Sequence, residues 1–194
     1  NKFANLAEQA STITMSGSLP KGLPEDYYND LIKIGQDAGA RVLLDTSGQT
    51  LTTAVNHPVK PYLIKPNEEE VKAITGSELD LADPESIKSA LTDPSLDGID
   101  WLVVSLGKDG AVAKLDGSFY RVTIPTVQAV NPVGSGDSTI AGFAKALDDG
   151  KSPEEVLKTG MTCGVLNAMS SKTGDIDPDP VSYTHLRAHE TVLD

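Results

Sequence analysis

The feature that most constrains the fold of this chain is the alternation of short β-rich runs with longer amphipathic segments. The β-rich runs lie at residues 12–18, 41–48 and 62–67, and the amphipathic segments at 24–39, 50–57 and 68–76. Strands and helices that alternate in this order form crossover units, and such units build a parallel sheet. The sequence therefore predicts an α/β fold, with helices packed on a mainly parallel sheet.

The second half of the chain adds an antiparallel edge and two long helices. The predicted elements are a polar helix at 83–94, a strand at 101–107, two strands within 111–124, and helices at 137–150 and 152–171. The pair Asp116-Gly117 is typical of a tight hairpin turn between the two strands. Ser152 and Glu155 have the spacing of a capping box, with Pro153 at the first helical position.

Composition limits the partners and the compartment. The 194 residues include 28 Asp and Glu against 16 Lys and Arg, for a formal charge of −12, and no basic cluster offers a footprint for nucleic acid or an anionic membrane. No apolar run approaches the ~20 residues that a spanning helix needs. Cys163 is the only cysteine, which excludes an internal disulfide and makes a reducing cytoplasm the default.

The loops at the carboxyl ends of the predicted strands are where a ligand is expected. Open parallel sheets bind ligands at that edge. The four loops in question follow Met15, Asp45, Lys65 and Ser105, and each carries unusual residues. Asp45 itself either faces a ligand or caps a turn.

The stretch "NPVGSGDSTIAGF", residues 131–143, places a carboxylate among very small residues just before a helix. Gly134, Ser135 and Gly136 let the backbone approach a ligand, and the amides that enter the helix suit an anion. Asp137 could there accept a proton from a hydroxyl while the amides stabilise a transferring phosphoryl group. The alternative is that Asp137 only caps a helix behind a glycine loop.

Other signatures of nucleotide-binding proteins and hydrolases are absent. The chain has no G-x-x-x-x-G-K-S/T, and "GSGDST" breaks the dinucleotide fingerprint at Thr139. It also has no G-x-S-x-G elbow, and His57 is the only histidine before the last ten residues, so a Ser-His-Asp hydrolase would lack its base. We interpret His57 as a residue of a surface loop.

Two further stretches have a nucleotide-binding character. In "LIKPNEEE", residues 63–70, helical spacing would put Asn67 and Glu70 on one face, where they could hold a hydrated Mg²⁺ with its phosphates. Acidic residues in a first helical turn also simply complement the helix dipole, which is how we interpret Glu68 and Glu69. "SLGKDG", residues 105–110, can bring Ser105 against a nucleotide or be an ordinary turn.

Together these stretches resemble the PfkB-type, ribokinase-like carbohydrate kinases. "NPVGSGDS" resembles the G-A/S-G-D signature of that family, "KPNEEE" its N-x-x-E motif, and "VSLGKDG" its nucleotide turn. "SGSLPKGLPEDYY" is similar to the segment before a substrate-facing helix. The order of the motifs also agrees, over about residues 11–178. Within the family, the residues of these motifs are most similar to those of the tagatose-6-phosphate kinases, with 1-phosphofructokinases and minor 6-phosphofructokinases as close relatives.

The resemblance implies a three-layer α/β/α fold and an ATP- and Mg²⁺-dependent kinase that phosphorylates a ketose phosphate such as tagatose 6-phosphate. It implies that Asp137 is the base and that Gly134, Ser135 and Gly136 form the anion hole, with Ser18 on the sugar phosphate. It also implies that Glu70 orders Mg²⁺ through water, and that the nucleotide is lined by Lys65, Asn67, Ser105, Gly107, Gly110, Gly164 and Asn167. For the helix around Gly164 and Asn167, apolar spacing also fits plain core, with Cys163 as a small buried residue. A non-catalytic paralogue that senses nucleotide or sugar phosphate is the alternative of another class.

Two departures from the family pattern affect the domain assignment. The N-terminal part of the family, with its sugar-recognition loop and the β-sheet lid that often dimerises, has no counterpart here, so we expect residues 1–180 to be an incomplete kinase core that is inactive alone. Residues 181–194 match, codon for codon from Val181 to Thr191, the translation of a transposase sequencing adapter. We therefore expect them to be a non-native tail, in which His185 and His189 form no metal site.

Overall fold

The computed structural model describes residues 2–176, and these form a single six-stranded mixed sheet. The strands run in chain order across the sheet: β1 (Thr12–Ser16), β2 (Arg41–Asp45), β3 (Leu63–Ile64), β4 (Trp101–Ser105), β5 (Ala111–Leu115) and β6 (Ser118–Val122). The first four are parallel to one another, and β5 and β6 are antiparallel to their neighbours. The predicted parallel sheet with an antiparallel edge is confirmed.

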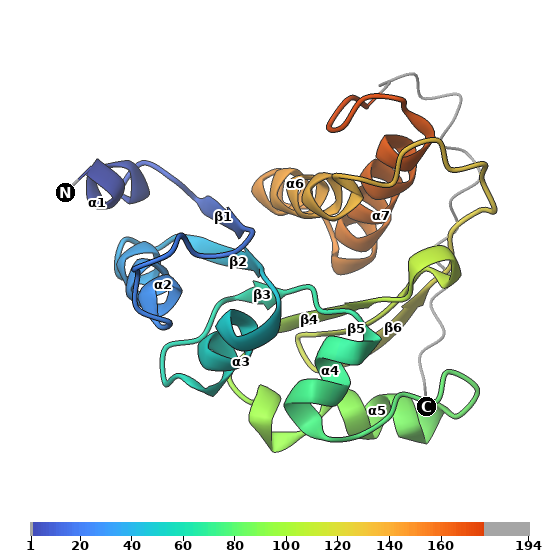
Figure 1. Cartoon of the computed structure of the whole chain (residues 1–194), viewed down its shortest axis with the longest axis horizontal. Coiled ribbons are helices and arrows are strands. Elements are labelled where there is room, and N and C mark those ends of the chain that lie inside the picture. Colours follow the sequence, from blue (N-terminus) through green and yellow to red (C-terminus); the bar gives the residue numbers. More distant parts are fainter. Residues whose placement is uncertain (1, 177–194) are drawn as a thin grey trace.

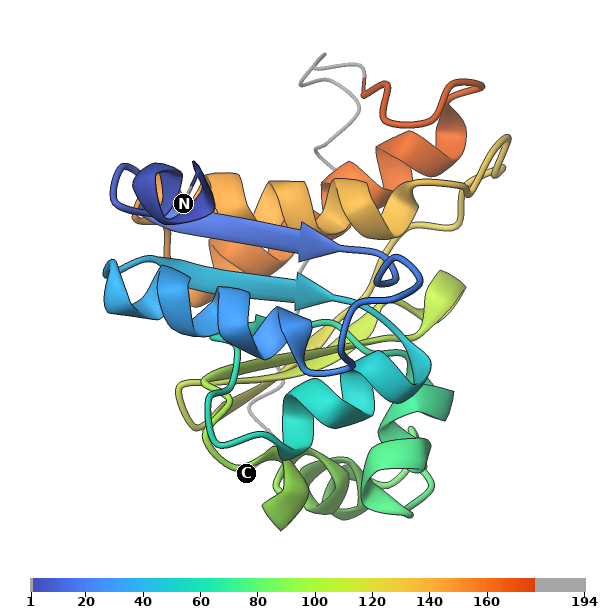
Figure 2. The same cartoon turned by 60° about the vertical axis from the view of Figure 1, so that its left-hand side comes forward.

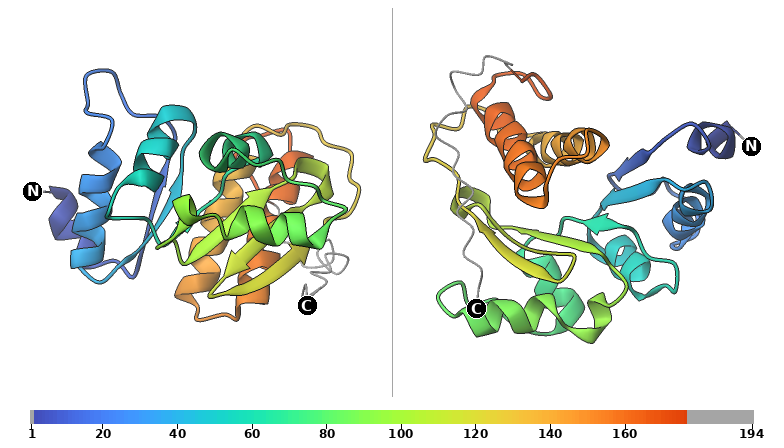
Figure 3. Two further views of the ribbon diagram at one scale, coloured as in Figure 1. Left: turned by 90° about the horizontal axis from the view of Figure 1, so that it is seen from below. Right: turned by 180° about the vertical axis from the view of Figure 1, so that it is seen from behind.

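The helices cover both faces of this sheet. They are α1 (Lys2–Ala7), α2 (Tyr27–Asp37), α3 (Gly48–Asn56), α4 (Glu68–Thr75), α5 (Pro84–Leu91), α6 (Ser135–Asp148) and α7 (Pro153–Met169), with short 3-10 turns η1 (Pro94–Leu96) and η2 (Gly107–Asp109). Figure 1 shows α6 and α7 on one side of the sheet and α2 to α5 on the other. The view from behind in Figure 3 shows the same three layers. The three-layer α/β/α prediction is thus confirmed, while α1 was not predicted.

Strands β2 to β5 each contribute to two hydrophobic cores, because successive side chains point to opposite faces. On β2, Val42 and Leu44 belong to the core beneath α2 to α5, and Leu43 belongs to the core beneath α6 and α7. The strand β4 divides in the same way, and all of its residues but the last are buried. Apolar runs of this kind are expected for strands covered on both faces.

Helices α6 and α7 pack closely because small residues face one another. A Cβ added at Gly142 would lie 2.7 Å from the Cα of Gly160, and a Cβ added at Gly160 would lie 2.1 Å from Cδ1 of Phe143. A Cβ at Gly164 would lie 2.3 Å from Oγ1 of Thr139. These contacts fix the position of α6, whose first turn carries Asp137.

Local signals in the sequence explain the start of α7 and the hairpin between β5 and β6. Ser152 and Glu155 form the predicted capping box of α7, with Pro153 in the first turn. At the hairpin, Asp116 and Gly117 both have positive φ, 49° and 83°, as a type I′ turn between twisted strands requires.

Candidate active site

The carboxyl ends of the parallel strands gather at one edge of the sheet and meet the first turn of α6 there. Figure 2 shows the arrows of β1 and β2 ending at this same edge. A cavity of about 410 Å³ lies there, lined by Gly17, Ser18, Asp45, Thr46, Ser47, Lys65, Asn67, Glu70, Ser105, Gly134, Gly136 and Asp137. Four strand-end loops and the glycine-rich turn, which lie far apart in the sequence, therefore form one site.

The turn before α6 presents backbone amides to this cavity. Gly134 is the N-cap of α6 in the left-handed region, with φ 84°, and makes no side-chain cap. The N–H of Ser135 donates to the carbonyl of Pro132 at 3.2 Å, so it stays within the turn. Among the described hydrogen bonds none uses the N–H of Gly136 or Asp137. The amides of Gly136 and Asp137 are therefore free for an anion, and the N–H of Gly134 also has no partner among the described hydrogen bonds. Of the predicted anion hole of Gly134, Ser135 and Gly136, only Ser135 has an N–H that is already used.

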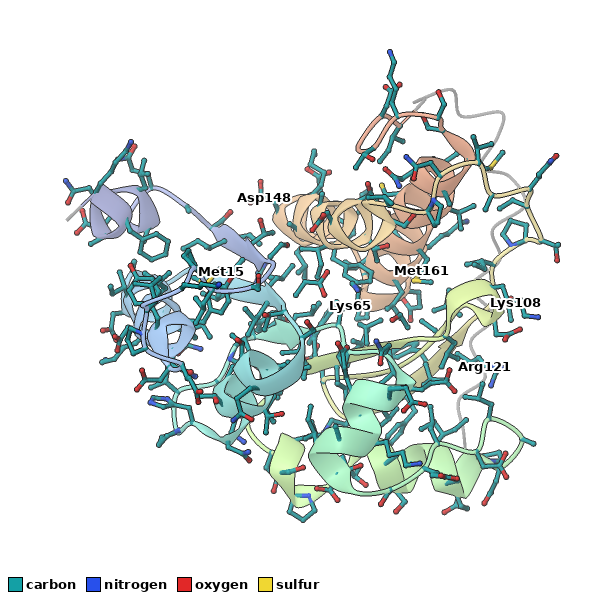
Figure 4. All side chains as sticks on the ribbon, viewed as in Figure 1. Met15, Lys65, Lys108, Arg121, Asp148 and Met161 are labelled. Carbon is teal, nitrogen blue, oxygen red and sulfur yellow. The ribbon has the colours of Figure 1, made fainter. Side chains whose placement is uncertain are left out.

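A buried ion pair lies directly against this turn. Nζ of Lys65 is 3.3 Å from Oδ1 of Asp45, and the two side chains are 10% and 19% exposed. A Cβ built on Gly136 would be 3.3 Å from Asp45 Oδ2 and 3.5 Å from Lys65 Nζ, so the ion pair lies in contact with the backbone of the turn. Figure 4 labels Lys65 between α6 and α4. A cation that faces a helix N-terminus across a small gap is suited to bind phosphate.

Burial raises the pKa of Asp45, and the nearby charge of Asp137 raises it further, while Lys65 lowers it through charge and hydrogen bonding. Burial has the largest effect on this pKa, so keeping the carboxylate charged in the site is unfavourable. A negative ligand that took over Lys65 would leave Asp45 without its counter-charge. Asp45, for which the sequence left a ligand-facing or a turn-capping role open, therefore faces the site.

Asn67 and Glu70 meet in a way that the sequence analysis did not predict. Asn67 has extended backbone and is the N-cap of α4, so it lies just outside the helix, but it lines the same cavity as Glu70. The side chain of Asn67 accepts from the N–H of Glu70 at 2.9 Å, and Oε2 of Glu70 accepts from the N–H of Asn67 at 2.8 Å. The N-x-x-E motif is thus a capping box, and it leaves one carboxylate oxygen of Glu70 for a ligand.

The loop after β1 places Ser18 at the cavity. The carbonyl of Gly17 accepts from Thr46 Oγ1 at 2.8 Å and from the hydroxyl of Tyr28 at 3.0 Å, and the N–H of Gly17 donates to the carbonyl of Asp45 at 2.9 Å. Sequence reasoning missed Gly17, Thr46 and Ser47 as lining residues. The signal was present, because Thr46 and Ser47 directly follow the strand end at Asp45.

The turn after β4 contributes only part of its predicted residues. Ser105 lines the cavity, and its hydroxyl donates to the carbonyl of Pro66 at 3.3 Å. Gly107 and Gly110 are not among the lining residues. A Cβ at Gly110 would lie 1.9 Å from the carbonyl oxygen of Val122, so this glycine permits the close approach of two backbones.

Gly164 and Asn167, predicted to line the nucleotide, also lie outside the cavity lining. Gly164 packs against Thr139, and the side chain of Asn167 is fully buried. The amide of Asn167 is bonded to the turn before α6, through the carbonyl of Val133 and the hydroxyl of Ser135. The structure therefore gives these two residues contacts within the protein instead.

Two other findings concern only residues 2–176. No group of three or more His, Cys, Asp or Glu side chains in this part of the chain is arranged to hold a metal ion. Among the described helices, none has the length and apolar character to cross a membrane. Cys163 is half-buried, and burial raises the pKa of its thiol, consistent with the predicted packing role. The predictions for His185, His189 and the tail fall outside the described residues.

Comparison with known proteins identifies the family. The sequence model for pfkB family carbohydrate kinases matches residues 1–180. The chain belongs to the pfkB family. The G-A/S-G-D turn of the family is the turn before α6, and its N-x-x-E motif is the capping box of α4.

Solved structures agree with this assignment. Phosphofructokinase-2 from Escherichia coli in complex with potassium has a TM-score of 0.77 and 29% identity, over 93% of this chain and 60% of that one. The same enzyme in complex with fructose-6-phosphate has a TM-score of 0.72 and 29% identity, over 86% and 56%. Ribokinase from Arabidopsis thaliana complexed with ribose and ATP shares the fold, with a TM-score of 0.74 and 24% identity over 89% and 54%. The chain thus spans about 60% of the phosphofructokinase-2 chain or slightly less.

Proposed function

We propose that the protein transfers the γ-phosphoryl group of ATP to a hydroxyl of a ketose phosphate, with tagatose 6-phosphate giving the 1,6-bisphosphate as the favoured reaction. The observation that carries this proposal is one turn that holds both an exposed carboxylate, Asp137, and two amides without protein partners, those of Gly136 and Asp137. A base for a hydroxyl and donors for a phosphoryl oxygen then lie side by side. Membership of the pfkB family supports the same chemistry.

In this reaction Asp137 accepts the proton of the sugar hydroxyl as the hydroxyl oxygen attacks the γ-phosphorus. The new P–O bond forms as the bond to the β-phosphate oxygen breaks, and ADP leaves with the electron pair. The amides of Gly136 and Asp137 donate to the phosphoryl oxygens, on which charge is distributed in the transition state. The dipole of α6, whose N-terminus points into the cavity, adds to this stabilisation.

The other side chains of the cavity would hold the nucleotide. Lys65 lies against Gly136 and can turn from Asp45 to a phosphate oxygen. Asn67 and Ser105 lie near one another, since their residues form an isolated bridge between backbone segments, and both line the cavity. We also propose Gly107 and Gly110 as backbone neighbours of the nucleotide on the strength of the family resemblance.

The residues present fit a hydrated Mg²⁺. Such an ion is usually bound by one or two carboxylates together with substrate phosphates, and it keeps several waters. Glu70 retains one oxygen that its capping box does not use, and Asp45 lines the same cavity. When bound, the ion would neutralise charge on the phosphates.

The sugar phosphate would bind beside the loop after β1. Ser18 lines the cavity from the loop after β1 and is the proposed contact for the sugar phosphate. We favour tagatose 6-phosphate because the residues of the motifs are most similar to those of the tagatose-6-phosphate kinases. Fructose 6-phosphate and fructose 1-phosphate are the alternatives, and phosphofructokinase-2, similar in structure, binds the first of them.

The first test is the substitution Asp137→Asn in the full-length natural protein that contains residues 1–180. We expect kcat to fall by at least ~10², the lower end of the usual contribution of a general base. Asp149→Asn is the matched control, because Asp149 lies just after the other end of α6 and pairs with Lys145 on the surface. Wild-type turnover by Asp137→Asn would overturn the role of Asp137.

The second test compares kcat/KM of the same protein on tagatose 6-phosphate, fructose 6-phosphate and fructose 1-phosphate, with ATP as donor. We expect the highest value for tagatose 6-phosphate. A higher value for either fructose phosphate would replace the proposed substrate while keeping the kinase. ATP binding without turnover on all three would instead support the sensing paralogue.

A further inference from the structure

Asn167, near the end of α7, is a fully buried polar residue whose side chain connects three segments. Its Nδ2 donates to the carbonyl of Val133 at 2.9 Å and to the hydroxyl of Ser135 at 3.1 Å. Its Oδ1 accepts from the N–H of Gly174 at 2.6 Å. The side chain is 0% exposed, so it reaches no ligand itself. One amide thus joins α7, the turn before α6 and the chain after α7.

The turn that Asn167 bonds to is also packed closely against the chain after α7. A Cβ added at Gly134 would lie 2.5 Å from Cγ2 of Thr173 and 3.5 Å from Oδ1 of Asn167. Nδ2 of Asn131 donates to the hydroxyl of Thr173 at 3.3 Å, which ties the start of the turn to the same segment. The turn therefore has its glycine against residues 173 and 174, with Asn167 as the bonded link between them.

We infer that Asn167 is a positioning residue for phosphoryl transfer, which acts by fixing the turn that carries the anion-binding amides and Asp137. This inference rests on the proposed function. Val133 and Ser135 flank Gly134, and Gly136 and Asp137 follow directly. A shift of the Val133 carbonyl or the Ser135 side chain would therefore move both the donors and the base. Displacement of reacting groups by ~1 Å is enough to cost ~10²-fold in rate.

The chemistry of an asparagine side chain fits this position closely. An amide supplies two N–H donors and one carbonyl acceptor, and here both donors and the acceptor are used. Asn167→Ala would leave three polar groups without their partner: the carbonyl of Val133, the hydroxyl of Ser135 and the N–H of Gly174. Asn167→Asp keeps nearly the same shape and the acceptor for Gly174, but it places an oxygen opposite the Val133 carbonyl and the Ser135 hydroxyl.

The experiment measures kcat and KM of Asn167→Ala and Asn167→Asp in the full-length natural protein, together with hydrogen exchange of the amides of residues 134–137. We expect kcat to fall ~10-fold or more, with KM for ATP and sugar phosphate changed less than ~3-fold, because positioning acts in the transition state. Amide exchange in the turn should become faster while the first half of α7 keeps its protection.

Thr162→Ala is the control, since Thr162 is also buried on α7 and donates to the carbonyl of Lys158 at 2.7 Å, away from the turn. It should lose stability and keep kcat. Wild-type kcat and wild-type exchange in either Asn167 variant would overturn the inference. If Asn167→Ala does not fold, the kcat and the amide exchange of Asn167→Asp alone test the inference. If the wild-type protein has no turnover, the proposed function fails, whereas exchange in the turn still tests the role of Asn167.

Discussion

At the scale of single residues, Asp45 makes the stability of the site depend on pH. Burial raises the folded-state pKa of this carboxyl above its ordinary value of 3.8, despite Lys65 beside it. A raised pKa in the folded state means that Asp45 favours folding fully at pH below 3.8 and loses this contribution as the pH rises through the folded value. The free energy of unfolding of the wild type, minus that of Asp45→Asn, should therefore fall as the pH rises through that range.

Urea unfolding of both proteins at several pH values measures this difference. Asn is the suitable replacement because it has the shape of the protonated acid and does not titrate. A difference that rises with pH would show that the ion pair with Lys65 outweighs burial. Asp37→Asn, at an exposed i,i+4 pair with Lys33, controls for the general effect of removing one carboxylate.

At the scale of elements, the first turn of α4 carries two functions in one carboxylate. Glu70 caps the helix through its bond to the N–H of Asn67 and is the proposed holder of hydrated Mg²⁺. Glu70→Gln keeps an oxygen that can accept the bond but removes the charge, whereas Glu70→Ala removes both. We expect Glu70→Ala to destabilise the fold by ~0.5–2 kcal/mol, the usual range for loss of a helix cap, and Glu70→Gln by less.

The Mg²⁺ dependence of turnover separates the two functions. Both Glu70 variants should need more Mg²⁺ for half of the maximal rate, since the charge is lost in each. Glu69→Gln is the matched control, because it removes one first-turn charge from the same helix and has no part in the capping box. If Glu70→Gln needed no more Mg²⁺ than the wild type, Glu70 would only cap the helix and would not hold the ion.

At the scale of the whole molecule, β1 leaves one edge of the sheet unpaired among the described residues. It is hydrogen-bonded to β2 alone, as β6 at the opposite edge is hydrogen-bonded to β5 alone. Unpaired edges favour association with another strand. We expect the isolated 194-residue chain to self-associate, and Thr14→Lys, a charge at an exposed position of β1, to weaken this association.

Sedimentation velocity over a range of concentrations tests the expectation. A chain that stays monomeric at high concentration, or association that Thr14→Lys leaves unchanged, would show that β1 is not the surface involved. A homodimer through the β-sheet lid of the family is a separate prediction, since it does not involve β1.

The sequence by itself determined all six strands and the helices from α2 to α7, the order of the motifs and the location of the site at the strand ends. These follow from local physics: the period of apolar residues, the capping box at Ser152 and Glu155, and the backbone freedom of Asp116-Gly117. The family motifs added Asp137, Lys65 and Glu70, and the structure brings all three to one cavity.

Only the tertiary structure decided which polar groups are already used. The N–H of Ser135 donates to the carbonyl of Pro132, and one oxygen of Glu70 accepts from the N–H at the start of α4. Gly164 packs against α6. Asn167 bonds to residues 32 and 34 positions earlier in the chain, a separation at which no local pattern operates. Local periodicity predicts which residues are buried, but the partners of a buried polar group depend on which distant segments pack beside it.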